Sequence, residues 1–236
     1  MSVPKNIATL TIVRYPTWAI PFALLSMAIF RLPLWLNKNI SFWKLMGSGK
    51  NGTFDKTPDW RQWAIMTSQN PTKLNAVQPE NWYGTFIHQY WAFCHCNIIH
   101  YLLEPLEGHG VWDGKQAFGA LPKQTEYDGE IAVLTRATVR LKRLKQFWAH
   151  VAGAAHDMTG AEGFVTSYGI GEIPWIKQAT FSIWKSKADM KNFAYKMKNH
   201  AEVVRKTRQE NWYSEEMFVR FKILGCWPGR LEEGKK

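Results

Sequence analysis

The stretch that decides the fold runs from Phe164 to Leu224 and opens with FVTSYGIG and, after a short turn, QATFSIW. It reads as four segments in the order strand, strand, helix, strand. The segments are Phe164–Gly171, Gln178–Trp184, a helix from about Lys187 to the region of Glu210, and the strand Glu216–Leu224. The last segment alternates apolar and polar side chains, which is typical of a strand with one buried face.

A histidine falls on the apolar side of the expected helix. Phe193, Met197, His200 and Val204 follow one another at spacings of four, three and four residues, so they share one helix face. A neutral imidazole directed into a space between helix and sheet can bind a haem iron and leave the opposite face open for O₂. The alternative is a core histidine that is hydrogen-bonded to the backbone.

The same plan occurs twice along the chain. A constant offset of 122 residues relates Arg14 to Arg136, Gly47 to Gly169 and Gly49 to Gly171. Each half reads β-α-β-β-α-β, which is a ferredoxin-like order. The expected elements outside the opening stretch are strands Ala8–Arg14, Trp63–Ser68 and Glu130–Arg140 and helices Trp18–Phe30, Trp82–Leu103 and Leu144–Ala155, with a further segment that ends at Leu45–Gly49.

These elements predict an α+β protein. We expect a ferredoxin-like half at 1–107, a linker at 108–129 and a second half at 130–236 that carries the haem site. Two such halves can join their sheets into one barrel, so the prediction is a single compact domain.

The composition of the chain favours some classes of binding partner over others. The 236 residues carry a formal net charge of +11 and include 13 Trp, so the chain is a folded, basic, aromatic-rich protein. Its positive charge suits an anionic membrane surface or an acidic protein. We expect no nucleic-acid partner, because the basic residues are scattered and no nucleic-acid-binding motif is present.

The cellular location expected from the sequence is the cytoplasm. Three cysteines do not make a disulfide framework, and no secretory signal pattern is present. Trp18–Phe30 is apolar but ends at Arg31, whereas a membrane span needs about 20 residues. We therefore expect a buried or interfacial helix, with peripheral contact to the cytoplasmic membrane left open.

Several segments together resemble a known family. They are FWKLMGSG (Phe42–Gly49), VWDGKQAF (Val111–Phe118), AVLTRATVR (Ala132–Arg140), IGEIPWIKQATFSIW (Ile170–Trp184) and HAEVVRKTRQENWYSEEMFVRFKIL (His200–Leu224). The chain resembles the spheroidene monooxygenases, bacterial ketolases of acyclic carotenoids. The resemblance implies a haem-dependent, O₂-using oxygenation of a carotenoid end group at C-2, and it implies a dimeric α+β barrel architecture. The positive charge of the chain suits an acidic electron donor such as a ferredoxin.

Three residues are the candidates for this chemistry. His200 is the expected iron ligand and cofactor-binding residue. Arg136 lies mid-strand, where a buried guanidinium needs a carboxylate such as a haem propionate, or iron-bound oxygen, as its partner. Its alternative is a solvent-facing charge. Gln178 is a candidate distal hydrogen-bond donor, because it begins a polar strand face.

A group of cysteines and histidines near the middle of the chain raises the question of a metal site. Cys94, His95 and Cys96 lie within the expected helix Trp82–Leu103, together with His88 and His100. Helical spacing would turn the two cysteines about 200° apart, which disfavours zinc. His88 stays open as a competing haem ligand, because its helix corresponds to the His200 helix.

Two other functions remain open at this point. The first is a non-catalytic haem-binding or lipid-binding protein with the same barrel. The second is a cofactor-free enzyme that acts on a small molecule and would show no visible absorbance.

Overall fold

The computed structural model describes residues 6–71, 78–196, 207 and 209–228. Within these ranges the strands are β1 (Ile7–Arg14), β2 (Ile40–Gly49), β3 (Pro58–Gln69), β4 (Asn97–Gly110), β5 (Ile131–Val139), β6 (Phe164–Ile173), β7 (Lys177–Trp184) and β8 (Tyr213–Pro228). The α-helices are α1 (Ile20–Ile29), α2 (Arg31–Leu36), α3 (Thr85–Phe93), α4 (Leu144–Thr159) and α5 (Lys187–Lys196).

The strands form a closed barrel. Hydrogen bonds join them in the order β1-β3-β2-β6-β7-β5-β8-β4, and β4 also pairs with β1 in antiparallel register. The predicted α+β class and the barrel are therefore confirmed. From β1 to β4 and from β5 to β8 the chain runs through strand, helix, strand, strand, helix and strand, with α1 and α2 both between β1 and β2.

Two compact units divide the chain. Unit 1 contains the described residues of Met1–Met46, Trp60–Glu104 and Ile223–Lys236, and unit 2 contains those of Gly47–Asp59 and Pro105–Lys222. Each unit has its own hydrophobic core.

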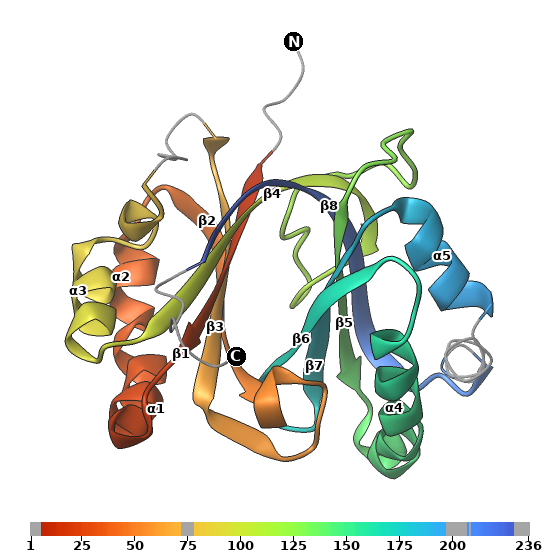
Figure 1. Cartoon of the computed structure of the whole chain (residues 1–236), viewed down its shortest axis with the longest axis horizontal. Helices are drawn as coiled ribbons and strands as arrows, with labels where there is room; N and C mark the ends of the chain where they lie inside the picture. The colour runs from red at the N-terminus through yellow and green to blue at the C-terminus, as the bar shows by residue number, and fades with distance from the viewer. Residues whose placement is uncertain (1–5, 72–77, 197–206, 208, 229–236) are drawn as a thin grey trace, which may run out of the picture. The chain divides into compact units, whose positions relative to one another are not determined.

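In unit 1, α1, α2 and α3 lie together on one side of β1 and β3 (Figure 1). Val13 and Leu102 of the strands pack there against Phe30 and Trp91 of the helical layer, all four of them buried. β1 is buried along almost its whole length, which suits its apolar sequence IATLTIVR.

In unit 2, α4 and α5 lie on one side of β5 and β8 (Figure 1). Ile131 and Val133 of β5 pack against Met190 and Phe193 of α5 in one core cluster. The rings of Phe193 and Trp184 lie 5.1 Å apart and anchor α5 on the sheet.

The prediction of one helix from Trp82 to Leu103 is wrong. α3 ends at Phe93, and His95 adopts a left-handed conformation with φ of 52°, which the helix cannot continue through. The next residues, NIIHYLL from Asn97, extend as β4 and pair with β1. Cys94 and Cys96 therefore lie in the turn after the helix rather than on two sides of it.

The expected helix from Lys187 to the region of Glu210 is described only as far as Lys196. Its continuation, including Met197, His200 and Val204, lies outside the described residues.

Candidate functional site

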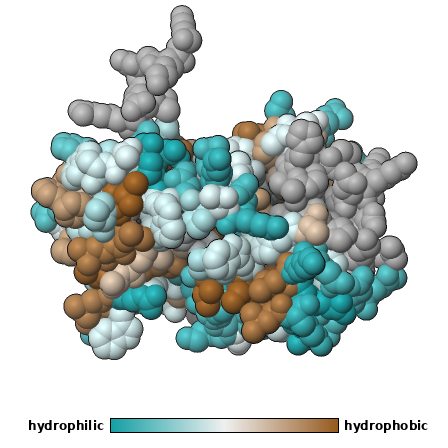
Figure 2. All heavy atoms as spheres, turned by 90° about the horizontal axis from the view of Figure 1, so that it is seen from below, coloured by the Kyte–Doolittle hydropathy of each residue, from teal (hydrophilic) through white to brown (hydrophobic). Residues whose placement is uncertain are grey.

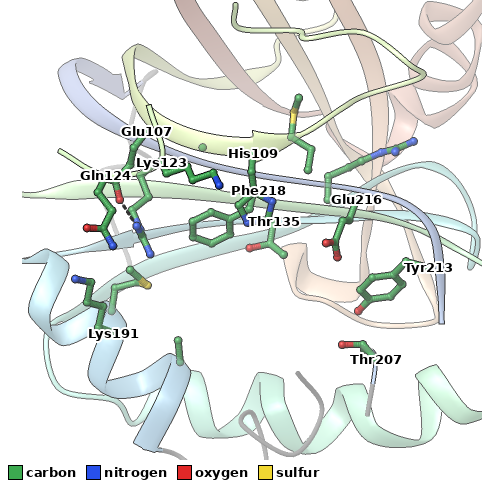
Figure 3. A pocket seen from close by; sticks show the side chains of 16 residues that line it. Glu107, His109, Lys123, Gln124, Thr135, Lys191, Thr207, Tyr213, Glu216 and Phe218 are labelled. Atoms are coloured by element: carbon green, nitrogen blue, oxygen red, sulfur yellow. Dashed lines mark hydrogen bonds and ion pairs between the residues drawn. The ribbon is translucent and has the colours of Figure 1, made fainter. Parts of the chain in front are cut away.

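A cavity of about 370 Å³ lies in unit 2 between α5 and the strands β4, β5 and β8; we call it the α5 cavity (Figure 3). Its lining residues are Glu107, Gly108, His109, Lys123, Gln124, Thr135, Arg136, Met190, Lys191, Ala194, Thr207, Tyr213, Glu216, Met217, Phe218 and Arg220. The sequence predicts a haem between a helix and the sheet, and the α5 cavity lies between such elements.

Strand register creates the floor of this cavity. Thr135 of β5 pairs with Phe218 of β8, and Val133 pairs with Arg220, so these side chains project from the same face of the sheet. Thr135 and Ala194 are small residues at the place where β5 faces α5. The short side chains leave room that larger residues would fill.

Aromatic and cationic groups lie side by side on this floor. The His109 imidazole stacks on the Phe218 ring, with centroids 5.7 Å apart and planes 19° apart. The guanidinium of Arg220 lies 4.7 Å from the centre of the same ring, which is cation–π geometry. The floor therefore combines aromatic rings with a positive charge that lies over the Phe218 ring.

A buried carboxylate holds one end of the cavity together. Glu107 is 1% exposed, and its Oε2 accepts hydrogen bonds from Lys187 Nζ at 2.7 Å and from the Thr125 backbone N–H at 2.6 Å. Its Oε1 accepts from Arg220. Burial alone would raise the pKa of Glu107, but the hydrogen bonds from Lys187, Arg220 and Thr125 lower it to about 2.

The cavity wall also carries cations that suit an anionic group. Lys123 and Lys191 line it together with Arg220 (Figure 3). The buried Nε of Arg220 makes no hydrogen bond within the part of the chain that the structure describes. A carboxylate of a bound molecule could accept from such a donor.

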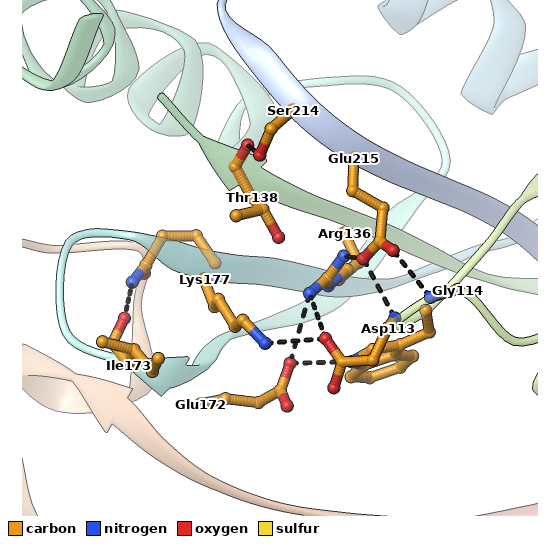
Figure 4. A network of polar contacts seen from close by, with 11 residues as sticks. Asp113, Gly114, Arg136, Thr138, Glu172, Ile173, Lys177, Ser214 and Glu215 are labelled. Atoms are coloured by element: carbon orange, nitrogen blue, oxygen red, sulfur yellow. Dashed lines mark hydrogen bonds and ion pairs between the residues drawn. The ribbon is translucent and has the colours of Figure 1, made fainter. Parts of the chain in front are cut away.

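Arg136 is buried rather than solvent-facing, so the alternative of a surface charge is wrong: it is 1% exposed. Its guanidinium donates to Glu215 and lies 3.4 Å from Asp113 Oδ1 and 3.5 Å from Glu172 Oε1 (Figure 4). The guanidinium also lies 5.6 Å from the centre of the Trp112 ring. Asp113, Glu172 and Glu215 therefore supply the carboxylates that a buried guanidinium needs.

The neighbours of Arg136 form a connected network. Lys177 Nζ lies 2.6 Å from Asp113 Oδ1, and the Trp112 indole N–H donates to Glu172 at 2.7 Å. Glu215 accepts from the backbone N–H groups of Asp113 and Gly114. Burial would raise the pKa of Glu215, but these N–H groups and Arg136 hold it below its usual value.

Gln178 lies at the start of β7, outside the lining of the α5 cavity. Its side-chain amide donates to the backbone carbonyl of Ile173 at 3.1 Å. The roles in catalysis or haem binding expected for Gln178 and Arg136 stay predictions.

The histidines expected near iron have separate outcomes. His200 lies outside the described residues. His88 is exposed on α3 in unit 1. His100 is buried on β4, where its Nδ1 lies 2.7 Å from the Thr11 hydroxyl. Among the residues that the structure describes, no group of three or more His, Cys, Asp or Glu side chains is placed to hold a metal.

Sequence reasoning missed Glu107, Lys187 and Arg220. The run NIIHYLL, shortly before Glu107, belongs to the segment that the sequence predicts as a helix, and the alternation in the last strand puts Arg220 on its polar side. A strand reading of 97–110 would have put Glu107 in a mostly apolar strand, where a carboxylate needs cationic partners.

Comparisons with known proteins place the chain in a family. It is 32% identical over 235 residues to the spheroidene monooxygenase of Rhodobacter capsulatus, and the match covers 95% of this chain and 94% of that protein. The spheroidene monooxygenase of Cereibacter sphaeroides is 33% identical over 202 residues, which is 82% of this chain and 60% of that protein.

A structural comparison agrees on the fold alone. An aldoxime dehydratase solved in complex with butyraldoxime matches with a TM-score of 0.63 at 7% identity, over 94% of this chain and 81% of that one. No family model matches the sequence. The sequence relatives decide the assignment: the chain belongs to the spheroidene monooxygenase family and is a monooxygenase.

Proposed function

We propose that this monooxygenase uses haem and O₂ to hydroxylate or ketolate the C-2 end group of an acyclic carotenoid. The observation that carries the proposal is the identity of 32% along 95% of the chain to a protein named for spheroidene oxygenation. The α5 cavity is the site that we assign to this chemistry.

The residues of the α5 cavity fit a haem. A haem needs a flat apolar environment for its ring and cations for its carboxylates. Met190, Ala194 and Phe218 supply apolar contacts, and Lys191 and Arg220 supply positive charge. The buried Nε of Arg220 makes no hydrogen bond among the described residues, so it is a donor that a haem carboxylate can use. When bound, the haem would supply the activation of O₂.

The chain's own residues would hold and orient the cofactor. We assign Lys123, Lys191 and Arg220 to the carboxylates and the Phe218 face to the ring. His200 remains our candidate for the residue that would bind the iron, because of the family resemblance and because apolar residues flank it at helical spacing. Glu107 would fix the direction of Arg220 rather than touch the cofactor, because both of its oxygens are already bonded.

An electron donor belongs to the proposal. A monooxygenase inserts one oxygen atom of O₂ into the substrate and reduces the other to water, so each turnover needs electrons. The net charge of +11 suits an acidic donor such as a ferredoxin. We expect turnover with that donor to fall as salt rises; activity that is independent of salt would remove this use of the charge.

The proposed architecture is two fused ferredoxin-like halves, residues 1–107 and 130–236, joined by a linker at 108–129. Ser48 of β2 pairs with Ile170 of β6, and these residues are related by the same 122-residue offset as the matching glycines. Pairing of a residue with its own counterpart is what a local two-fold axis between the halves requires.

The first experiment is a visible spectrum after haem addition. Wild type should show an intense band near the blue edge of the visible range. The band should shift or vanish in His200→Ala but not in His88→Ala. Haem binding without oxygen-dependent conversion of acyclic carotenoids would favour the non-catalytic haem-binding or lipid-binding alternative. No haem binding by wild type would overturn the cofactor and the site together.

A second pair of variants tests the cavity separately. Lys123→Gln with Lys191→Gln should weaken haem binding, because both cations line the cavity. Lys142→Gln with Lys145→Gln removes the same charge from exposed positions of unit 2 and should leave haem binding unchanged. An equal loss in both would mean that overall charge, and not the cavity, attracts the haem.

A further inference from the structure

The helices of unit 1 expose an unusual amount of apolar side chain. The exposed members, which we call the α1–α3 apolar surface, are Trp18, Leu24, Leu25, Leu32, Trp35, Leu36, Phe86 and Phe93. Figure 2 shows hydrophobic residues gathered at the left of the view, where α1 and α2 lie in Figure 1. Soluble monomers rarely leave a continuous apolar area of this kind uncovered.

The surface is continuous across separate helices. Phe22 of α1 contacts Phe93 of α3 with ring centroids 5.8 Å apart, and Phe30 contacts Phe86 at 6.3 Å. These contacts bury Phe30 but leave Phe86 50% and Phe93 63% exposed. The outward halves of the α3 rings therefore extend the apolar side of α1.

The first helices are apolar on both sides. Ala23, Ser26, Phe30 and Leu34 form the buried stripe at helical spacing. The opposite side carries Leu24 and Leu25 in α1 and Leu32 and Trp35 in α2 instead of polar residues. A helix that is apolar all round is buried or lies in lipid, and here only one side is buried by protein.

Charge indicates what covers the outer side. The first acidic residue of the chain is Asp55, and the segments of α1, α2 and α3 contain no Asp or Glu. Arg31 and Lys38 are exposed beside the apolar residues. A protein surface that is apolar, edged by cations and free of acids complements an anionic lipid surface.

Tryptophan placement gives the same answer. Trp18 is 54% and Trp35 73% exposed; Trp18 lies just before α1, and Trp35 lies near the end of α2. Indole rings prefer the boundary between lipid and water. We propose that the α1–α3 apolar surface docks this protein on an anionic membrane, with α1 and α2 lying in the interface.

Docking on the surface is favoured over spanning. By length and composition Thr17–Leu36 could cross a membrane, with 20 residues of mean hydropathy 1.8. However, α1 ends at Ile29, α2 begins at the charged Arg31, and Ala23 and Leu34 are packed into the unit 1 core. If Thr17–Leu36 crossed the membrane, these buried residues would lose their contacts in the unit 1 core.

The test is co-sedimentation of the full chain with vesicles, without haem or carotenoid, so that its outcome is separate from that of the proposed function. Wild type should bind vesicles of phosphatidylcholine with phosphatidylglycerol and bind pure phosphatidylcholine more weakly. Leu32→Ser should reduce partitioning about tenfold, and Leu32→Ser with Trp35→Ser should reduce it further. Lys38→Gln should weaken binding to the anionic vesicles but not to pure phosphatidylcholine. The difference from wild type should disappear at high salt, because salt screens the attraction between Lys38 and the lipid.

Leu141→Ser is the matched control. Leu141 is 71% exposed against 61% for Leu32, and it also has cationic neighbours, Lys142 and Arg143, but it lies in unit 2. It should leave vesicle binding unchanged, and thermal unfolding should show that each variant is folded.

Four outcomes would overturn the proposal. They are absence of vesicle binding by wild type, an equal loss in Leu141→Ser, retention of wild type on vesicles through an alkaline carbonate wash, and a dimer in solution that Leu32→Ser dissociates while vesicles bind neither form. The third outcome would indicate a spanning helix, and the fourth a second copy of the chain as the occupant.

Discussion

Glu107 Oε2 lies 2.7 Å from Lys187 Nζ in the interior of unit 2, where the two side chains are 1% and 11% exposed. Arg220 binds the other carboxylate oxygen, and Thr125 donates from its backbone and its hydroxyl. One anion thus compensates two buried cations beside the α5 cavity. Removing the anion is costly because both cations would keep their desolvation penalty.

Glu107→Gln should therefore destabilise the protein by about 3–5 kcal/mol, the range for breaking a buried ion pair on one side. The free energy of unfolding, measured with urea, checks this. Glu210→Gln is the control, because its pair with Arg143 is only partly buried, at 36% and 29% exposure. It should cost about 1 kcal/mol or less. Equal losses would show that the Glu107 network adds nothing beyond a surface pair.

The same carboxylate predicts a pH dependence. The pKa of Glu107 is about 2 in the folded state, against about 4.3 for an unperturbed glutamate. The unfolded chain thus binds the proton first, and the contribution to stability, about 3 kcal/mol, is present above pH 4.3 and is lost as pH falls toward 2. Urea unfolding at several pH values should show a shallower acid decline in Glu107→Gln than in wild type. Parallel declines would contradict the assignment.

Local patterns predicted much of unit 2. The alternation in Glu216–Leu224 places Met217, Val219 and Phe221 on one buried side, as β8 has them. The alternation predicts a polar, solvent-facing other side, and it does not indicate that one of the polar residues there is buried. Arg220 is buried there because a residue 113 positions earlier, Glu107, reaches it. Pairs so distant in sequence leave no periodic signal.

The expected helix Trp82–Leu103 failed for a local reason. Apolar residues from Trp82 through Leu103 are dense enough to suit either a helix or a buried strand. The break is made by His95 in a left-handed conformation, which a histidine signals far less strongly than a glycine does. The error hid β4, and with it Glu107 and His109 of the cavity.

Arg136→Met should destabilise the protein by about 3–5 kcal/mol, because it removes the buried guanidinium that lies against Asp113, Glu172 and Glu215. Its deficit relative to wild type should shrink as pH falls through the lowered pKa of Glu215, because a protonated Glu215 no longer needs the charge of Arg136. Urea unfolding across pH measures both effects. A deficit that grows as pH falls would show that Arg136 does not compensate these acids.

The same variant separates a structural role of Arg136 from a role at the cofactor. Haem titration of folded Arg136→Met should show weaker binding if the guanidinium also reaches a haem carboxylate. Unchanged affinity would confine Arg136 to the network in Figure 4.

A pair of glycines tests how closely β4 approaches β8. Gly110 and Gly119 have similar positive φ values, 86° and 84°. A Cβ on Gly110 would overlap the backbone carbonyl of Glu216, whereas a Cβ on Gly119 would meet nothing within 4 Å. Gly119→Ala should therefore cost only the left-handed conformation, about 1–2 kcal/mol.

Gly110→Ala should cost about 3 kcal/mol or more, because overlap with a strand carbonyl adds to the same conformational term. Glu216 lines the α5 cavity, so a displaced β8 should also weaken any ligand that binds there. Urea unfolding of both variants isolates the steric part, since their φ costs cancel in the difference. Equal destabilisation would mean that β8 moves aside freely, and the floor of the cavity would then be adaptable rather than fixed by the β4–β8 contact.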